Sequence, residues 1–128
     1  MNIPPNLSPR SFRVLVVEDE AILAIDIAGQ LSDAGFETVG PAASVAKALG
    51  LINEEGCDVA VLDFNLRDET AERIAGELRA RATPFLFLSG VSRERLPQWC
   101  SDVMLLPKPI RPDALLAALR QLLAPQTR

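Results

Sequence analysis

The chain has 128 residues, of which 48% are apolar, and a formal net charge of −4. This length fits one domain with its own hydrophobic core, and the acidic balance argues against nucleic acid as a direct partner, because phosphate binding needs a basic face. The chain has no histidine, which excludes the usual zinc ligand and every catalytic arrangement built on that residue.

The two ends of the chain predict neither a targeting segment nor a membrane span. Residues 1–11 carry three prolines and no long apolar stretch, so we interpret them as a flexible lead. Residues 12–123 are expected to form a single domain and residues 124–128 a frayed tail. Cys57 and Cys100 are far apart and show no Cys-x-x-Cys spacing, which favours a reducing compartment over a disulfide framework. We therefore expect a cytoplasmic protein.

Short apolar runs predict the strands of a sheet. Four of these runs lack alternation of polar and apolar residues, as expected for strands that are buried on both faces. They span residues 12–17, 58–63, 84–89 and 102–107, and a weaker strand is predicted at residues 37–41.

Apolar residues at helical spacing predict helices between these runs. The stripes are Leu23, Ile27, Leu31 and Ala34; Val45, Leu49 and Ile52; Ala71, Ile74, Ala75 and Leu78; and Leu115, Leu119 and Leu122. Ser44 is placed to cap the second helix, Gly35 and Gly56 are placed to end the first two, and Pro112 suits the first turn of the last. Pro97 should break residues 92–100, where only a short or irregular helix is expected.

This alternation predicts an α/β domain of the flavodoxin-like (βα)₅ type, a doubly wound parallel sheet with helices on both faces. Right-handed crossovers leave few topologies, and we expect the strand order 2-1-3-4-5. That order puts the weak strand at residues 37–41 on one edge. The strand that carries Pro107 lies on the other edge, where a proline is tolerated.

Polar side chains follow the predicted strands at their carboxyl ends. They are Glu18, Asp19 and Glu20 after the first strand, Asp63 at the end of the third, Ser89 and Gly90 at the fourth, and Lys108 after the fifth. Because ligands of such sheets bind outside the carboxyl ends of the strands, we expect these side chains to share one rim.

This constellation suits phosphoryl transfer. The Asp63 carboxylate can act as the nucleophile, and Glu18 and Asp19 can hold a hard cation, Mg²⁺ first and Mn²⁺ or Ca²⁺ as alternatives. Lys108 and the Ser89 hydroxyl can contact the phosphoryl oxygens. Two other interpretations stay open: the acids could cap a helix, and Asp63 could form a turn.

The segments "LVVEDE", "VLDFNL", "LSG" and "LPKPI" resemble, in this order, the receiver domain of bacterial two-component response regulators. The resemblance covers residues 12–123. It implies a phosphorelay protein, itself not an enzyme, whose Asp63 accepts a phosphoryl group from a histidine kinase or a phosphotransfer protein.

The resemblance also implies a role for each residue of the rim. Mg²⁺ would be bound by Glu18, Asp19, Asp63 and the backbone carbonyl of Asn65, with Ser89 as the switch hydroxyl, Lys108 as the phosphate-pairing lysine and a cis Lys108–Pro109 bond.

The chain departs from the common receiver pattern. Many receivers carry an aromatic residue three positions before the lysine, where this chain has Leu105. "DFNLRDE" and "PFLFLSG" resemble a subgroup of stand-alone alphaproteobacterial receivers that have a "PFxFxTGY"-like segment and lack that aromatic residue. Ser89 takes the threonine place and Val91 the tyrosine place. We still expect the loop after Asp63 and residues 89–100 to move on phosphorylation.

The leading hypothesis is a single-domain response regulator that acts through contacts with a downstream protein, as a monomer or weak dimer. The helix after the acids would dock the kinase, and residues 89–123 would form the output face. Alternatives are a receiver of a hybrid histidine kinase and a receiver-like binding module that needs no phosphorylation. A Mg²⁺-dependent phosphatase of the haloacid dehalogenase type would need a second carboxylate at the position of Asn65.

Overall fold

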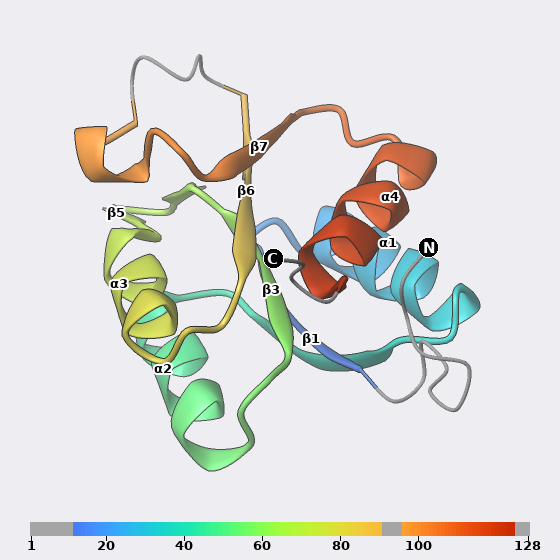
Figure 1. The fold of residues 1–128 in the computed structure, drawn as a ribbon, viewed down its shortest axis with the longest axis horizontal. Coiled ribbons are helices and arrows are strands. Elements are labelled where there is room, and N and C mark those ends of the chain that lie inside the picture. The colour runs from blue at the N-terminus through green and yellow to red at the C-terminus, as the bar shows by residue number, and fades with distance from the viewer. Residues whose placement is uncertain (1–11, 91–95, 125–128) are drawn as a thin grey trace.

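The computed structural model describes residues 12–90 and 96–124, so the predicted lead, Val91 and most of the predicted tail lie outside it. Figure 1 shows the fold. The elements, in chain order, are β1 (Arg13–Val17), α1 (Ala21–Asp33), β2 (Glu37–Ala42), α2 (Val45–Glu54), β3 (Val59–Asp63), β4 (Asn65–Leu66), β5 (Glu69–Thr70), α3 (Glu72–Ala80), β6 (Phe85–Ser89), the 3₁₀ helix η3 (Gln98–Cys100), β7 (Met104–Pro107) and α4 (Pro112–Leu123).

Five strands form one sheet in the order β2-β1-β3-β6-β7, and each pairs in parallel with its neighbours. Since β6 and β7 are the fourth and fifth of the predicted strands, the expected order is confirmed. Helices α2 and α3 lie on one face of the sheet, and α1 and α4 lie on the other (Figure 1). The exposed Pro107 ends the edge strand β7, as predicted.

The inner strands are buried on both faces, which explains their unbroken apolar sequence. Every residue of β3 and β6 is buried, and so is every residue of β1 except Arg13. Leu15 and Phe87 belong to the core cluster with α2 and α3, whereas Val16 and Leu88 belong to the cluster with α1 and α4. Successive residues of one strand therefore fill two different cores.

The predicted helix signals are confirmed. The Ser44 hydroxyl accepts a hydrogen bond from the backbone N–H of Lys47 at 3.2 Å, so it caps α2. Gly35 and Gly56 follow the ends of α1 and α2 with φ angles of 95° and 71°, and Pro112 is the first residue of α4. In the described part of residues 92–100 only the short helix η3 forms, after Pro97.

The hairpin formed by β4 and β5 was not predicted. Its strands have two residues each and pair antiparallel around a turn at Arg67 and Asp68, where Asp68 has a φ angle of 63°. Strands this short are below the length at which hydrophobic periodicity carries a signal. The hairpin follows Asp63 directly and so lies at the end of the sheet where the polar residues gather.

An irregularity in β2 was also not predicted. The register between β1 and β2 shifts between Leu15 and Val17, and the Gly40–Pro41 bond at this point is cis. Gly40 has a φ angle of 91°, and a Cβ atom there would lie 2.8 Å from the backbone nitrogen of Ala42. Only glycine fits this backbone without displacing β2.

We therefore expect Gly40→Ala to lower the free energy of unfolding by about 1–3 kcal/mol, because the new methyl group meets backbone atoms and the φ angle is unfavourable. Gly29→Ala is the matched control, since a Cβ at Gly29 meets no described atom within 4 Å inside α1. That control should raise stability by about 0.5–1 kcal/mol. Urea unfolding measures both, and equal stability of the two variants would contradict this account of β2.

Candidate functional site

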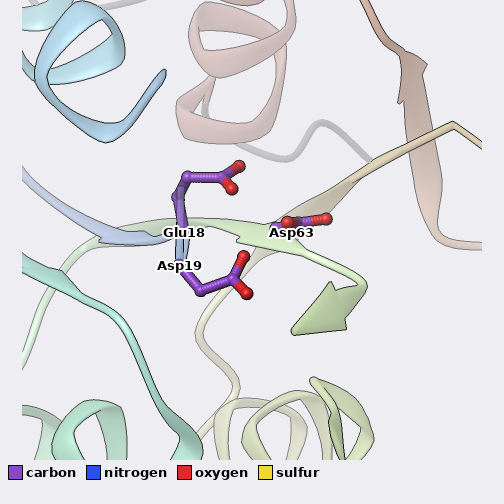
Figure 2. Close-up of side chains that lie close together, drawn as sticks. All are labelled: Glu18, Asp19 and Asp63. Atoms are coloured by element: carbon purple, nitrogen blue, oxygen red, sulfur yellow. The ribbon is translucent and has the colours of Figure 1, made fainter. Parts of the chain in front are cut away.

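Three carboxylates meet at the carboxyl ends of β1 and β3. Glu18 and Asp19 follow β1, and Asp63 is the last residue of β3. The two strands pair in parallel, so their ends lie side by side. One carboxylate oxygen from each residue lies within 4.8 Å of the other two, and Figure 2 shows the three side chains gathered together.

Lys108 joins this group from the edge strand. Its backbone N–H donates to the Ser89 carbonyl at 3.1 Å, which extends the pairing of β7 with β6 toward the site. Its Nζ atom lies 3.2 Å from Asp63 Oδ2 and 3.4 Å from Glu18 Oε1. Glu18 and Asp63 are only 2% and 3% exposed, so one ammonium group faces two buried carboxylates. The Lys108–Pro109 bond is cis, as the resemblance implies.

The negative charge of Glu18 is not fully compensated. Its Oε2 atom accepts the Glu20 backbone N–H at 3.1 Å, whereas the buried Oε1 accepts no hydrogen bond from a described residue. The 3.4 Å separation from Lys108 Nζ is an ion-pair contact without good hydrogen-bond geometry. Burial raises the pKa of Glu18 from 4.5 to about 7, and the nearby Asp63 carboxylate adds to the rise.

The pKa of Lys108 is raised as well, but for a different reason. Its burial lowers its pKa, but the carboxylates of Asp63 and Glu18 outweigh that effect, so the pKa of Lys108 is raised overall. The ammonium group therefore stays charged across the physiological range and holds the two acids together.

Asp19 connects the acids to the hairpin. Its Oδ2 atom accepts the backbone N–H of Arg67 at 2.9 Å, which holds the β4–β5 turn at the rim of the site. The resulting cavity has a volume of about 360 Å³ and is lined by Glu18, Asp19, Glu20, Asp63, Asn65, Arg67 and Lys108. Arg67 was missed in the sequence analysis, because a single arginine in an unpredicted turn carries no recognisable signal.

Ser89 lies beside this cavity and is not among the described residues that line it. It ends β6, is 2% exposed, and follows Leu88, which pairs with Asp63 across the sheet. Leu105 of β7, which stands where many receivers have an aromatic residue, pairs with Phe87 of β6 and packs against the α2–α3 core cluster.

The structure disfavours the two simpler interpretations of the acids. Glu20 is the N-cap residue of α1, but among the described residues its side chain makes no capping hydrogen bond, and the first helical turn holds no acid. Asp63 belongs to β3, and the turn lies further on, at Arg67 and Asp68. Glu18, Asp19 and Asp63 instead lie close together at the site.

These residues fit a hard dication. Carboxylate oxygens are the ligands that Mg²⁺ prefers, and three of them come from Glu18, Asp19 and Asp63. The buried Oε1 atom of Glu18 accepts no hydrogen bond from a described residue, and the pKa of that carboxyl group is raised because burial and the Asp63 carboxylate disfavour its charged form more than Lys108 favours it. A bound cation would supply the missing compensation.

A family model described as the response regulator receiver domain matches residues 14–120 of the chain. The chain belongs to this family. As a receiver domain it is part of two-component signalling, and its fold and strand order agree with that membership. Among the helices of the described ranges, none has both the length and the apolar character needed to span a bilayer.

Several proteins are similar to this receiver. It is 30% identical to the transcriptional regulatory protein PdtaR of Mycobacterium tuberculosis over 91 residues, which are 70% of this chain and 44% of PdtaR. It is 36% identical to a protein-glutamate methylesterase/protein-glutamine glutaminase of Anaeromyxobacter dehalogenans over 90 residues, 69% of this chain and 25% of that protein. The matched region thus spans less than half of these curated relatives.

Among solved structures, SdrG from Sphingomonas melonis Fr1 superposes with a TM-score of 0.77 at 35% identity, covering 88% of this chain and 97% of SdrG. The receiver domain of Erythrobacter litoralis PhyR superposes with a TM-score of 0.78 at 20% identity, covering 91% of this chain and 96% of that one, which supports the fold alone.

The raised pKa of Glu18 predicts a pH-dependent affinity for Mg²⁺. The metal binds the deprotonated carboxylate, so protons compete with it below the pKa of about 7. We expect the affinity to rise by up to about tenfold per pH unit toward pH 7 and to level off above it. Isothermal titration calorimetry between pH 5.5 and 8 measures this dependence.

Glu18→Gln should bind Mg²⁺ weakly and lose most of the pH dependence, because it removes the titrating group. Glu54→Gln, an exposed acid at the end of α2, serves as the control and should behave like the wild type. An affinity that does not change with pH in the wild type would contradict the role of Glu18.

Proposed function

We propose that this receiver domain accepts a phosphoryl group on Asp63 from a histidine kinase or phosphotransfer protein, in a Mg²⁺-dependent reaction. The observation that carries the proposal is the buried Asp63 carboxylate, which lies 3.2 Å from the Lys108 ammonium group and beside two further acids. An oxygen of Asp63 attacks phosphorus, the bond from phosphorus to the donor nitrogen breaks, and the departing nitrogen takes a proton from solvent. The product is an acyl phosphate.

The surrounding side chains have distinct roles in this proposal. Glu18, Asp19, Asp63 and the backbone carbonyl of Asn65 would hold Mg²⁺, which supplies positive charge for the phosphoryl oxygens. Lys108 supplies a fixed positive charge to another oxygen, and the Ser89 hydroxyl donates a hydrogen bond once the group is in place.

The protein is then a stoichiometric signalling component and not an enzyme that acts on separate substrates. A phosphatase with an aspartate nucleophile would need a second carboxylate two residues after it, and Asn65 has an amide there, which cannot transfer a proton. Phosphorylation would change the contacts that this protein makes with a downstream protein. The protein would act in the cytoplasm as a monomer or weak dimer.

The start of α1 offers a docking surface for the phosphoryl donor. Ile22 and Ile25 are 84% and 70% exposed, next to the acidic cavity that Glu20 also lines. Large apolar side chains this exposed indicate a contact surface. A donor protein bound there would bring its phosphohistidine close to Asp63, while residues 89–123 would carry the output surface.

Incubation with Mg²⁺ and a small phosphoramidate donor should give a phosphate adduct that is stable in acid and labile in alkali. Intact-mass spectrometry should show no adduct for Asp63→Asn, because the nucleophile is gone, and none without metal. Asp33→Asn, an exposed acid at the end of α1, is the control and should be labelled like the wild type. Persistent labelling of Asp63→Asn would place the acceptor elsewhere.

The docking surface predicts a difference between donors. The double variant Ile22→Ala and Ile25→Ala should slow transfer by about five- to tenfold from the histidine kinase that phosphorylates the wild type fastest in a kinase panel, because apolar contact area is lost. Phosphorylation by the small donor should stay unchanged, since it needs no docking. Equal slowing with both donors would argue that the variant damages the site itself.

A further inference from the structure

Arg67 is the second cation of the acidic cavity. The described residues that line it include four carboxylates, from Glu18, Asp19, Glu20 and Asp63, but only two cations, Lys108 and Arg67. With all of these groups charged, the lining carries an excess of negative charge that a bound dication would only balance, so the negative charge of an incoming phosphoryl group needs further compensation. Each positive charge at the rim of the cavity therefore favours the approach of the phosphoryl group to Asp63.

The two cations differ in what they already contact. Lys108 is held by two buried carboxylates, at 3.2 Å and 3.4 Å. Arg67 is exposed, and its guanidinium group makes no hydrogen bond or ion pair with any described residue. Of these two lining cations, Arg67 is therefore the one that can turn to a new anion without giving up a partner among the described residues.

The backbone of Arg67 is nevertheless fixed at the site. Its N–H donates to Asp19 Oδ2 at 2.9 Å, and it lies in the tight turn between β4 and β5, followed by Asp68 with its φ angle of 63°. This tether involves no side-chain atom of Arg67. A substitution of the side chain thus leaves the turn anchored, while the native side chain extends from a fixed base at the cavity rim.

We propose that the Arg67 guanidinium group contacts the phosphoryl group during transfer to Asp63 and is a catalytic residue of this receiver, an inference that rests on the function proposed above. Arg67 keeps its protons and donates paired N–H bonds to oxygens of the phosphoryl group, while Asp63 forms the new bond to phosphorus and the donor nitrogen leaves. A planar guanidinium group matches this arrangement of oxygens better than an ammonium group.

The same positive charge has an opposite effect on the metal. Arg67 repels a dication in the cavity, so its removal should strengthen Mg²⁺ binding while it slows phosphorylation. A residue that only holds the hairpin in place would weaken both when replaced. The two measurements together therefore separate a contact with the phosphoryl group from a structural role.

The experiment compares Arg67→Ala, Arg67→Lys and the control Arg73→Ala, whose exposed side chain in the first turn of α3 is not among the residues that line the cavity. Phosphorylation by phosphoramidate at saturating Mg²⁺ is followed by intact-mass spectrometry, and Mg²⁺ affinity by calorimetry. Arg67→Ala should react about five- to tenfold more slowly and bind Mg²⁺ more tightly. Arg67→Lys should retain part of the rate, and Arg73→Ala should match the wild type in both.

Two results would overturn the inference about Arg67 alone: an Arg67→Ala rate within twofold of the wild type, or a Mg²⁺ affinity that falls together with the rate. If the wild type forms no adduct, or if Asp63→Asn still forms one, the proposed function fails and the role of Arg67 fails with it.

Discussion

One ammonium group between two buried carboxylates is the interaction on which the site depends. Lys108 Nζ lies 3.2 Å from Asp63 and 3.4 Å from Glu18, and both acids are almost completely withdrawn from solvent. Burying a carboxylate costs free energy unless charge and hydrogen bonds compensate it, and here one cation serves two acids. The site therefore holds more negative than positive charge among its described residues, and this excess favours the binding of a dication.

The parallel sheet is what makes this arrangement possible. All of its strands end at the same edge, so residues that are distant in the sequence meet there without a long loop to carry them. The buried inner strands fix the positions of these ends, because successive residues are held in two separate cores. The β4–β5 hairpin is then joined to the edge through Asp19, which brings Arg67 to the rim.

The core next to the site is aromatic on one side. Phe64 directly follows Asp63, and its ring packs edge-to-face on Phe87 with 5.2 Å between centroids, while Phe87 contacts Phe85 in the same way at 5.6 Å. Leu105 completes this layer in β7. The backbone that carries Asp63 is thus anchored in the α2–α3 core, so a displacement at the phosphoryl acceptor would have to involve Phe64 and its neighbours.

The sequence alone determined the five strands, the helices, their order and the residues at the strand ends. These follow from local patterns, since each inner apolar run ends at or just before a polar residue, and parallel topology assigns all such ends to one edge. The predicted strands began one or two residues too early at most, for example at residue 102 where β7 begins at Met104.

Only the tertiary structure decided the short hairpin, the irregular backbone at Gly40, the burial of Glu18 beside an exposed Glu20, and the place of Arg67. Each depends on contacts between segments far apart in the chain, such as the bond from Arg67 to Asp19, and no local pattern of residues encodes those contacts.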